Sequence, residues 1–274
     1  MSYTRTERRV ASRSVAPSDW SWSAEALAPL VIAAVYLVAV RREDAGPWRI
    51  ASFLAGCALL VAALVSPLDT LAREYLVWAH LLQNVVLAEW APLLLVLGVP
   101  PRLAARLTRG RLVRALTLPF VALPLWAGTY ALWHVPALYD GALARPHTLL
   151  VLEHATYVVA GALMWWCVWQ DAPHRLHPGG RAAYVFAGFV ISAPLGLLLA
   201  LVPEPIYDTY ATAPERVWGI DRTFDQQLGG MTMAAEQSIV FFAVFAYWFA
   251  RFLAEEDRAD GDPVNAPGEP APPA

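Results

Sequence analysis

Long apolar runs separated by short polar connections dominate this chain. Crossing a hydrocarbon layer of about 30 Å takes about 20 apolar residues in a helix, because an unpaired backbone group in lipid is too costly for any open structure. The runs that approach this length cover residues 24–40, 48–66, 75–97, 116–136, 149–169, 182–202 and 228–253. The pattern predicts an all-α, polytopic membrane protein, a bundle of seven transmembrane helices in a lipid bilayer.

The two ends of the chain differ from this middle part. The first residues carry several arginines followed by Pro17 and Trp20, so we interpret residues 1–22 as a flexible extension and not as a cleaved signal. The transmembrane domain is expected over residues 23–254. From Glu255 onward the chain is acidic and rich in proline, and residues 255–274 are predicted to be a disordered tail.

Composition supports the membrane assignment and excludes other classes. Hydrophobic residues make up 58% of the chain and charged residues 16%, and the mean hydropathy is +0.44, unlike an average soluble domain. The formal net charge of -3 offers no basic field for nucleic acid. Cys57 and Cys167 lie far apart inside apolar runs, so neither a disulfide framework nor a thiol relay is indicated.

Arginine placement predicts how the helices are inserted. Cytoplasmic connections carry an excess of basic residues, and the densest group follows the third run, at Arg102, Arg106, Arg109, Arg111 and Arg114. With seven spans, this connection shares a side with the carboxyl terminus. We therefore predict a multi-pass protein with its amino terminus outside and its carboxyl terminus in the cytoplasm.

Polar and ionisable side chains inside the predicted spans gather near one face of the membrane. Such residues are expensive in lipid, so they normally face the bundle interior and indicate a functional site. Because successive helices alternate in direction, the start of the third span, the end of the fourth and the starts of the fifth and seventh share a face. On the arginine distribution, that face is the extracytoplasmic one.

The residue types on this face favour a copper site. Imidazole is the commonest metal ligand, and thioether sulfur favours Cu(I). The predicted ligands are His80, His134, His147, His154, Asp225 and Met233. The residues predicted to line the site and orient the ligands are Gln83, Asn84, Glu153, Gln226 and Glu236. The alternative is that each histidine only hydrogen-bonds between helices.

Several short motifs carry a resemblance to a known family. They are HLLQNVVL from His80 with the following APLLLVLGVP, LWHVPALYD from Leu132, LEH from Leu152, PIYDTY from Pro205 and DQQLGG from Asp225. Together they resemble the CtaG family, the assembly factors of caa-type cytochrome c oxidases. The motifs occur in family order over residues 48–253, which is most of the chain.

The resemblance implies a seven-helix protein of the bacterial inner (plasma) membrane that matures a haem-copper oxidase by handling copper for its extracytoplasmic copper centre. An oxidase subunit or a copper chaperone would be its partner. The residues carried over as the family's recurring polar positions are His80, His134, His154 and Asp225, accompanied by Gln83, Glu153 and Gln226. The chain departs from the family pattern at Asn84, where a histidine is usual, and in the segment MTMAAE after Gly230.

Two other functions stay open at this point. A transporter or channel for copper or protons would use Glu89 and Glu236, which continue the polar path toward mid-span. A haem protein would use His80 and His134 as axial ligands. No nucleophile, base and oxyanion-stabilising set is apparent, so we predict that the protein is not an enzyme.

Overall fold

All regular structure in the described part of the chain is helical, which confirms the all-α prediction. The computed structural model describes residues 16–213 and 216–260. In chain order the elements are η1 (Ala24–Ala26), α1 (Leu27–Val40), α2 (Pro47–Val65), α3 (Pro67–Glu74), α4 (Val77–Val85), η2 (Val86–Trp90), α5 (Ala91–Gly98), α6 (Pro101–Leu107), α7 (Arg111–Leu116), α8 (Pro119–Trp133), α9 (Pro136–Leu143), α10 (Leu149–Trp169), α11 (Pro178–Leu201), α12 (Asp208–Ala211), η3 (Val217–Gly219) and α13 (Arg222–Asp260).

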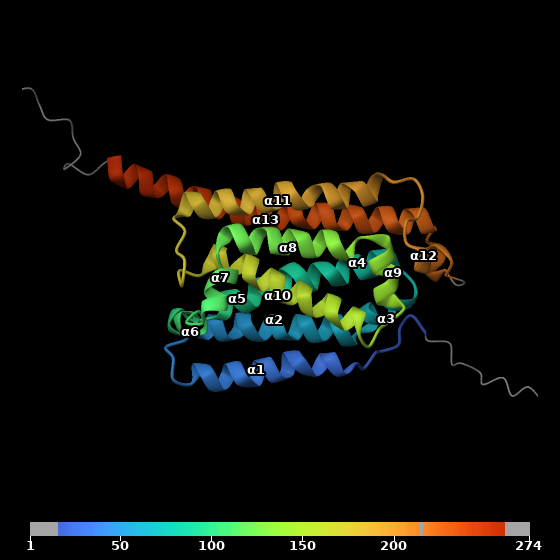
Figure 1. Cartoon of the computed structure of the whole chain (residues 1–274), viewed down its shortest axis with the longest axis horizontal. Helices are drawn as coiled ribbons and strands as arrows, with labels where there is room; N and C mark the ends of the chain where they lie inside the picture. Colours follow the sequence, from blue (N-terminus) through green and yellow to red (C-terminus); the bar gives the residue numbers. More distant parts are fainter. Residues whose placement is uncertain (1–15, 214–215, 261–274) are drawn as a thin grey trace, which may run out of the picture.

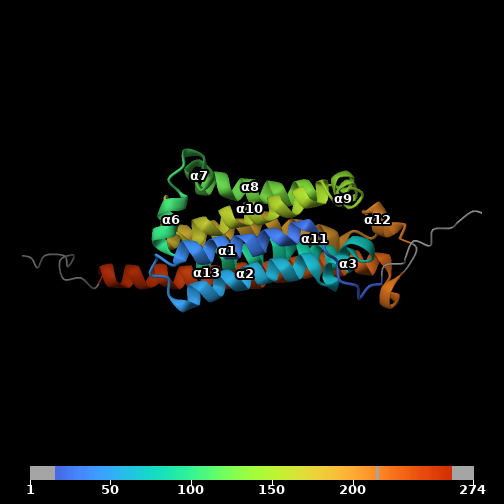
Figure 2. The ribbon, with the colours of Figure 1, turned by 90° about the horizontal axis from the view of Figure 1, so that it is seen from below.

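The long helices lie lengthwise beside one another, and short helices close the two ends of the bundle (Figures 1 and 2). Helices α3, α9 and α12 lie at one end, called here the α9–α12 end. Helices α6 and α7 lie at the opposite end, the α6–α7 end. The chain enters α1 at the α9–α12 end, and α13 extends past the α6–α7 end (Figure 1).

Five helices are long and apolar enough to cross a membrane alone. They are Pro47–Val65, Val77–Gly98, Leu149–Trp169, Pro178–Leu201 and Arg222–Arg258. The other two predicted spans form shorter helices: Ala24–Val40 is apolar but short, and α8 has 15 residues, about 22 Å of helix. The prediction of a membrane bundle is thus supported for five spans, whereas the count of seven is not confirmed.

The third and last spans differ in detail from their predicted ranges. The third begins at Val77, after a break at Tyr75 and Leu76, and contains one π-helical stretch, η2, in its middle. Helix α13 continues to Asp260, through the first residues of the segment expected to be a disordered tail. Residues 1–15 and 261–274, which include most of both predicted extensions, lie outside the described residues.

Glycines allow two close helix crossings. A Cβ on Gly230 of α13 would lie 2.4 Å from the backbone nitrogen of Ala200 in α11. A Cβ on Gly161 of α10 would lie 2.0 Å from the carbonyl oxygen of Ala88 in η2. Small residues that let backbones approach are typical of helix packing in membranes. The second crossing fixes η2 against α10.

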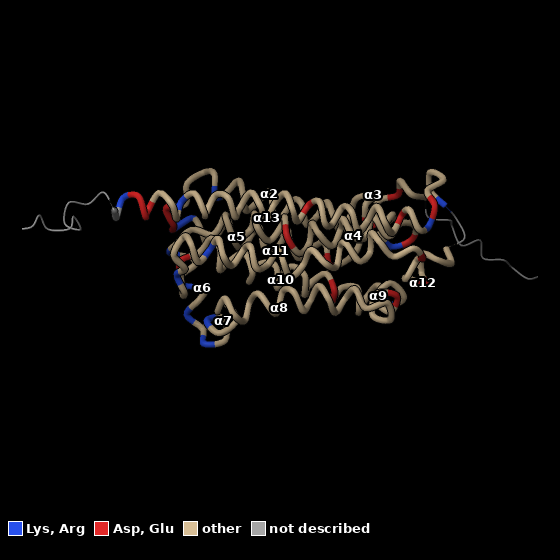
Figure 3. Tube along the Cα trace, turned by 90° about the horizontal axis from the view of Figure 1, so that it is seen from above, with Lys and Arg blue, Asp and Glu red and all other residues tan. Residues whose placement is uncertain are grey.

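The ends of the bundle differ in charge (Figure 3). The arginine group predicted to be cytoplasmic lies on and between α6 and α7, at Arg102, Arg106, Arg109, Arg111 and Arg114. Acidic residues lie along the middle of the bundle, at the α9–α12 end and on the part of α13 that extends past the α6–α7 end (Figure 3). The buried polar residues of the predicted site lie toward the α9–α12 end.

Candidate functional site

Two histidines and a glutamate lie near one another inside the α9–α12 end of the bundle. His80 lies in the first turn of α4, His134 directly follows α8, and Glu153 lies one turn into α10. His80 and Glu153 are fully buried and His134 is 5% exposed. His80 Nε2 is 3.4 Å from Glu153 Oε1, and Asn84 Nδ2 donates to the same oxygen at 3.3 Å. The alternation of helix direction, read from the sequence, correctly brings these residues together.

Hydrogen bonds made by the Nδ1 atoms fix the tautomer of both imidazoles. His134 Nδ1 lies 2.8 Å from the carbonyl oxygen of Tyr130, which can only accept. His80 Nδ1 lies 3.0 Å from the Tyr210 hydroxyl, whose own proton is donated to the carbonyl of Ala72. Each neutral ring therefore carries its proton on Nδ1 and keeps a lone pair on Nε2.

The two Nε2 atoms have no hydrogen-bond partner, although both are buried. Asn84 Oδ1 and Glu153 Oε2 are also buried and unpartnered. Buried polar atoms are normally satisfied, so each exception calls for an explanation. A group of atoms that can only accept is the arrangement that a cation would satisfy. Among the described residues, however, no group of three or more His, Cys, Asp or Glu side chains is placed to hold a metal ion.

Tyrosines form the cover of this site. Tyr139 of α9 lies 4.7 Å from the His80 ring and 6.3 Å from the His134 ring, measured between centroids. Tyr139 stacks on Tyr207 at 3.8 Å, and Tyr210 of α12 completes the cover. Burial raises the pKa of all three phenols above the ordinary value, so they remain neutral. Sequence reasoning missed their role, although all three lie within the motifs LWHVPALYD and PIYDTY.

Asp140 joins the two short helices that carry these tyrosines. Its carboxylate accepts from the backbone N–H of Asp208 at 3.2 Å and from the N–H and hydroxyl of Thr209 at 2.9 and 2.7 Å. A carboxylate at the first turn of a helix satisfies donors that have no partner within the helix. Asp140 therefore ties α9 to α12, in addition to the stacking of Tyr139 on Tyr207.

His154 lies apart from the other two histidines. It follows Glu153 directly, and adjacent residues on a helix point about 100° apart. Glu153 faces His80, whereas His154 Nδ1 contacts Glu25 Oε2 of η1 at 3.1 Å. His154 and Glu25 line an apolar pocket between α1, α2 and α10. The structure thus does not gather the three predicted imidazoles around one point.

Other predicted site residues make structural contacts. Asp225 accepts from the backbone N–H groups of Val77 and Trp78, both at 3.0 Å, and so caps α4 from another helix. Gln83 donates to the carbonyl of Ala63 at 2.7 Å and to Asp69 at 2.9 Å.

The remaining predicted residues lie at the edges of the site or deeper in the bundle. Gln226 accepts from the N–H of Ile206 at 2.8 Å and donates to the carbonyl of Glu204 at 3.1 Å. His147 is exposed in the turn before α10. Met233 is fully buried on α13, and Glu236 lies one turn deeper, where it accepts from Trp90.

Comparison with known proteins identifies relatives over most of the chain. A sequence model of the family described as cytochrome c oxidase caa3 assembly factor (Caa3_CtaG) matches residues 33–255. One uncharacterized protein of Mycobacterium bovis and one of Mycobacterium tuberculosis are each 26% identical over 253 residues. The match covers 81% of this chain but 38% of each relative, so the chain spans well under half of their length. No solved structure matches.

Proposed function

The chain belongs to the Caa3_CtaG family of cytochrome c oxidase caa3 assembly factors, and from this we propose that it holds copper transiently for the oxidase in the site formed by His80, His134 and Glu153. Membership of the family supports a role in oxidase assembly. It also suggests a non-catalytic protein. The copper cargo, the ligand residues and the partner are the proposal.

One observation carries the proposal. Two buried imidazoles are oriented through Nδ1 and leave the Nε2 lone pairs of His80 and His134 without a partner, next to the carboxylate of Glu153. Imidazole suits copper, and hydrogen bonds that fix the tautomer are the usual support for a ligating histidine. If the histidines served only to join helices, these two buried Nε2 atoms would remain without a hydrogen-bond partner, which favours the copper site.

The ligand set is small, as transient holding requires. Asn84 takes the place where the family usually has histidine, and its amide is bonded to Glu153. His154 is held by Glu25 and does not contribute. Because the three side chains are not arranged as a ready metal site among the described residues, binding would require them to shift toward the ion. Two imidazoles and a carboxylate also leave coordination positions open, so the cargo could be received from a copper chaperone and passed to an oxidase subunit.

The position of the site suits delivery outside the cytoplasm. The arginine-rich α6–α7 end is the expected cytoplasmic end because basic residues are retained on that side. The site lies toward the α9–α12 end, which is also the end at which α1 begins. This supports a protein of the bacterial inner membrane whose site is extracytoplasmic. Its amino terminus would lie outside and its carboxyl terminus in the cytoplasm.

Anaerobic titration of the purified protein with Cu(I), against a chromophoric competitor, tests the proposal. The wild type is expected to bind about one equivalent, and His80→Ala and His134→Ala should each weaken the affinity by at least about 100-fold. His147→Ala, an exposed histidine, is the matched control and should bind as the wild type does. Unchanged binding by the folded double variant His80→Ala/His134→Ala would overturn the copper site.

A second measurement connects binding to assembly. In cells that lack the native protein, the wild type should restore copper content and activity of the caa3-type oxidase, whereas the double variant should not. His147→Ala should restore both. Full restoration by a double variant that binds no copper in vitro would show that assembly does not use this site.

A further inference from the structure

A second buried polar group lies in the middle of the bundle, away from the histidine site. Its first member, Glu89, is in the π-helical turn η2 (Val86–Trp90) and is fully buried. A π turn inserts one residue into a helix and is frequent at functional sites. It shifts which residues of α4 and α5 face the interior. Here it accompanies a carboxyl group placed inside a membrane helix.

Glu89 and Glu236 lie next to each other, because Gln237, the neighbour of Glu236, bonds to Glu89 and Trp90, the neighbour of Glu89, bonds to Glu236. The Tyr130 hydroxyl donates to Glu89 Oε1 at 2.7 Å, and Gln237 Nε2 donates to the same atom at 3.2 Å. On Glu236, Oε1 accepts from Trp90 Nε1 at 2.6 Å. These contacts come from α8, α13 and η2, so three elements hold the pair in place.

The hydrogen-bond donors around Glu89 and Glu236 are neutral, and two of the carboxyl oxygens have no donor. Glu89 Oε2 and Glu236 Oε2 are buried and have no partner, and their residues are 0% and 7% exposed. No arginine or histidine bonds to either carboxyl group among the described residues. Two carboxylates in contact in such surroundings cannot both ionise. A proton held between the two carboxyl groups would give these unpartnered oxygens a donor.

We propose that Glu89 and Glu236 form a proton-binding site in the middle of the membrane, that they share one proton, and that this proton is released when a cation occupies the histidine site. The first part depends on the pair alone. The second part rests on the proposed function, because it requires a cation at His134.

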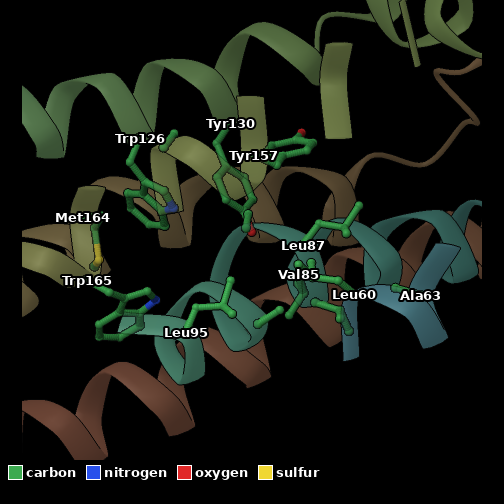
Figure 4. Close-up of a cluster of buried hydrophobic side chains, with 14 of the residues drawn as sticks. Leu60, Ala63, Val85, Leu87, Leu95, Trp126, Tyr130, Tyr157, Met164 and Trp165 are labelled. Atoms are coloured by element: carbon green, nitrogen blue, oxygen red, sulfur yellow. The ribbon is translucent and has the colours of Figure 1, made fainter. Parts of the chain in front are cut away.

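Tyr130 connects the two sites. Its carbonyl accepts from His134 Nδ1 at 2.8 Å while its hydroxyl binds Glu89 at 2.7 Å. Tyr157 lies beside it, with ring centroids 5.3 Å apart and its hydroxyl 3.5 Å from His134 Nδ1. In Figure 4 the Tyr130 ring extends from its helix into the core, with its hydroxyl directed toward the segment that carries Leu87. The titratable groups around the pair are thus Tyr130 and, behind it, Tyr157 and His134.

Charge coupling follows from this short connection. A cation on His134 Nε2 adds a positive charge two side chains from the pair, in a medium that screens it little. The positive charge favours loss of the shared proton, which leaves as H⁺ to water at the α9–α12 end. Both carboxylates are then ionised, a state that only the added charge of the cation at His134 allows. Unloading the cation reverses the step, and the pair regains its proton.

Infrared difference spectroscopy of the purified protein tests the proton site without any metal. The spectrum of the wild type minus that of Glu89→Gln/Glu236→Gln should contain the C=O band of a protonated carboxyl group, persisting from mildly acidic to mildly alkaline pH and shifting in D₂O. Glu74→Gln, an exposed carboxyl on α3, should give no such band. If the double variant is folded and its difference spectrum contains only carboxylate bands, the shared proton is refuted.

Proton release on Cu(I) addition tests the coupling. In weak buffer with a pH dye, the wild type should release about one proton per copper more than the double glutamine variant, while both bind one equivalent of copper. Equal release would refute the coupling and leave the copper site standing. If the wild type binds no copper, the proposed function and the coupling both fail, and the infrared result alone decides the proton site.

Discussion

Replacing Asp225 by alanine separates a structural role from a metal-binding one. The Asp225 carboxylate is 1% exposed and accepts from the backbone N–H groups of Val77 and Trp78 at 3.0 Å each. Helix α4 has no cap of its own, because its preceding residue Leu76 offers no side-chain hydrogen bond. Asp225 therefore satisfies two of the donors that every helix start leaves unpaired. The structure predicts that it positions His80 and does not bind metal.

The magnitude follows from these two bonds. A hydrogen bond to a charged group contributes about 1.5–3 kcal/mol, and loss of a helix cap costs about 0.5–2 kcal/mol. Partial access of water to the freed N–H groups reduces the sum, so Asp225→Ala should lose about 2–4 kcal/mol of unfolding free energy. For a chain of this size that corresponds to a thermal midpoint lower by about 4–16 °C. Asp225→Asn keeps an acceptor and should lose less than half as much.

Thermal unfolding in detergent and Cu(I) titration give the two readouts. Asp225→Ala should be destabilised and should bind copper more weakly, because the start of α4 carries His80. The matched control is Asp221→Ala, since Asp221 also accepts from two backbone N–H groups but is exposed; it should change both readouts less. If Asp225→Ala unfolds at the wild-type temperature and yet binds no copper, the capping role is refuted and Asp225 is a ligand.

Further substitutions test the site and its support. Asn84→His restores the residue usual in the family and should tighten Cu(I) binding about tenfold, about 1.4 kcal/mol; unchanged affinity in competitor titrations would show that position 84 does not reach the ion. Tyr210→Phe removes the acceptor for His80 Nδ1 and should lower stability by about 1–2 kcal/mol and weaken copper binding, whereas equal affinity would make the hydroxyl irrelevant to the ligand. Gly161→Ala places a Cβ 2.0 Å from the Ala88 carbonyl and should cost about 1–3 kcal/mol or more; a wild-type midpoint would mean that α10 and η2 separate easily.

Helix positions and the face that holds the site could be predicted from the sequence. Apolar length alone places α10 at its observed bounds, and alternating helix direction brings His80, His134 and Glu153 to one end. Rotation about each helix axis could not be predicted. Glu153 and His154 are neighbours on α10, yet Glu153 faces His80 and His154 faces Glu25. The spacing of polar residues in the sequence agrees equally well with either of them facing His80.

Features that depend on packing were also beyond the sequence pattern. The π turn η2 needs no particular residue and changes which side chains face inward after Glu89. The tyrosine cover was missed because tyrosine near a span end usually indicates an interfacial anchor, whereas Tyr139 and Tyr210 are folded inward over the histidines. Asp225 was predicted as a metal ligand from its place on the same membrane face as the histidines. Its observed partners are backbone N–H groups, which the residue pattern does not specify.

The tyrosine cover has a kinetic consequence. Because Tyr139, Tyr207 and Tyr210 are almost completely shielded from solvent, an ion cannot reach or leave the histidines while α9 and α12 stay in place. Exchange of an ion bound as proposed would therefore require these two helices to move apart, so the rate of this opening sets an upper limit on the speed of exchange. A docking protein that pulls on Asp140 or its neighbours would open the site without competing for the ion.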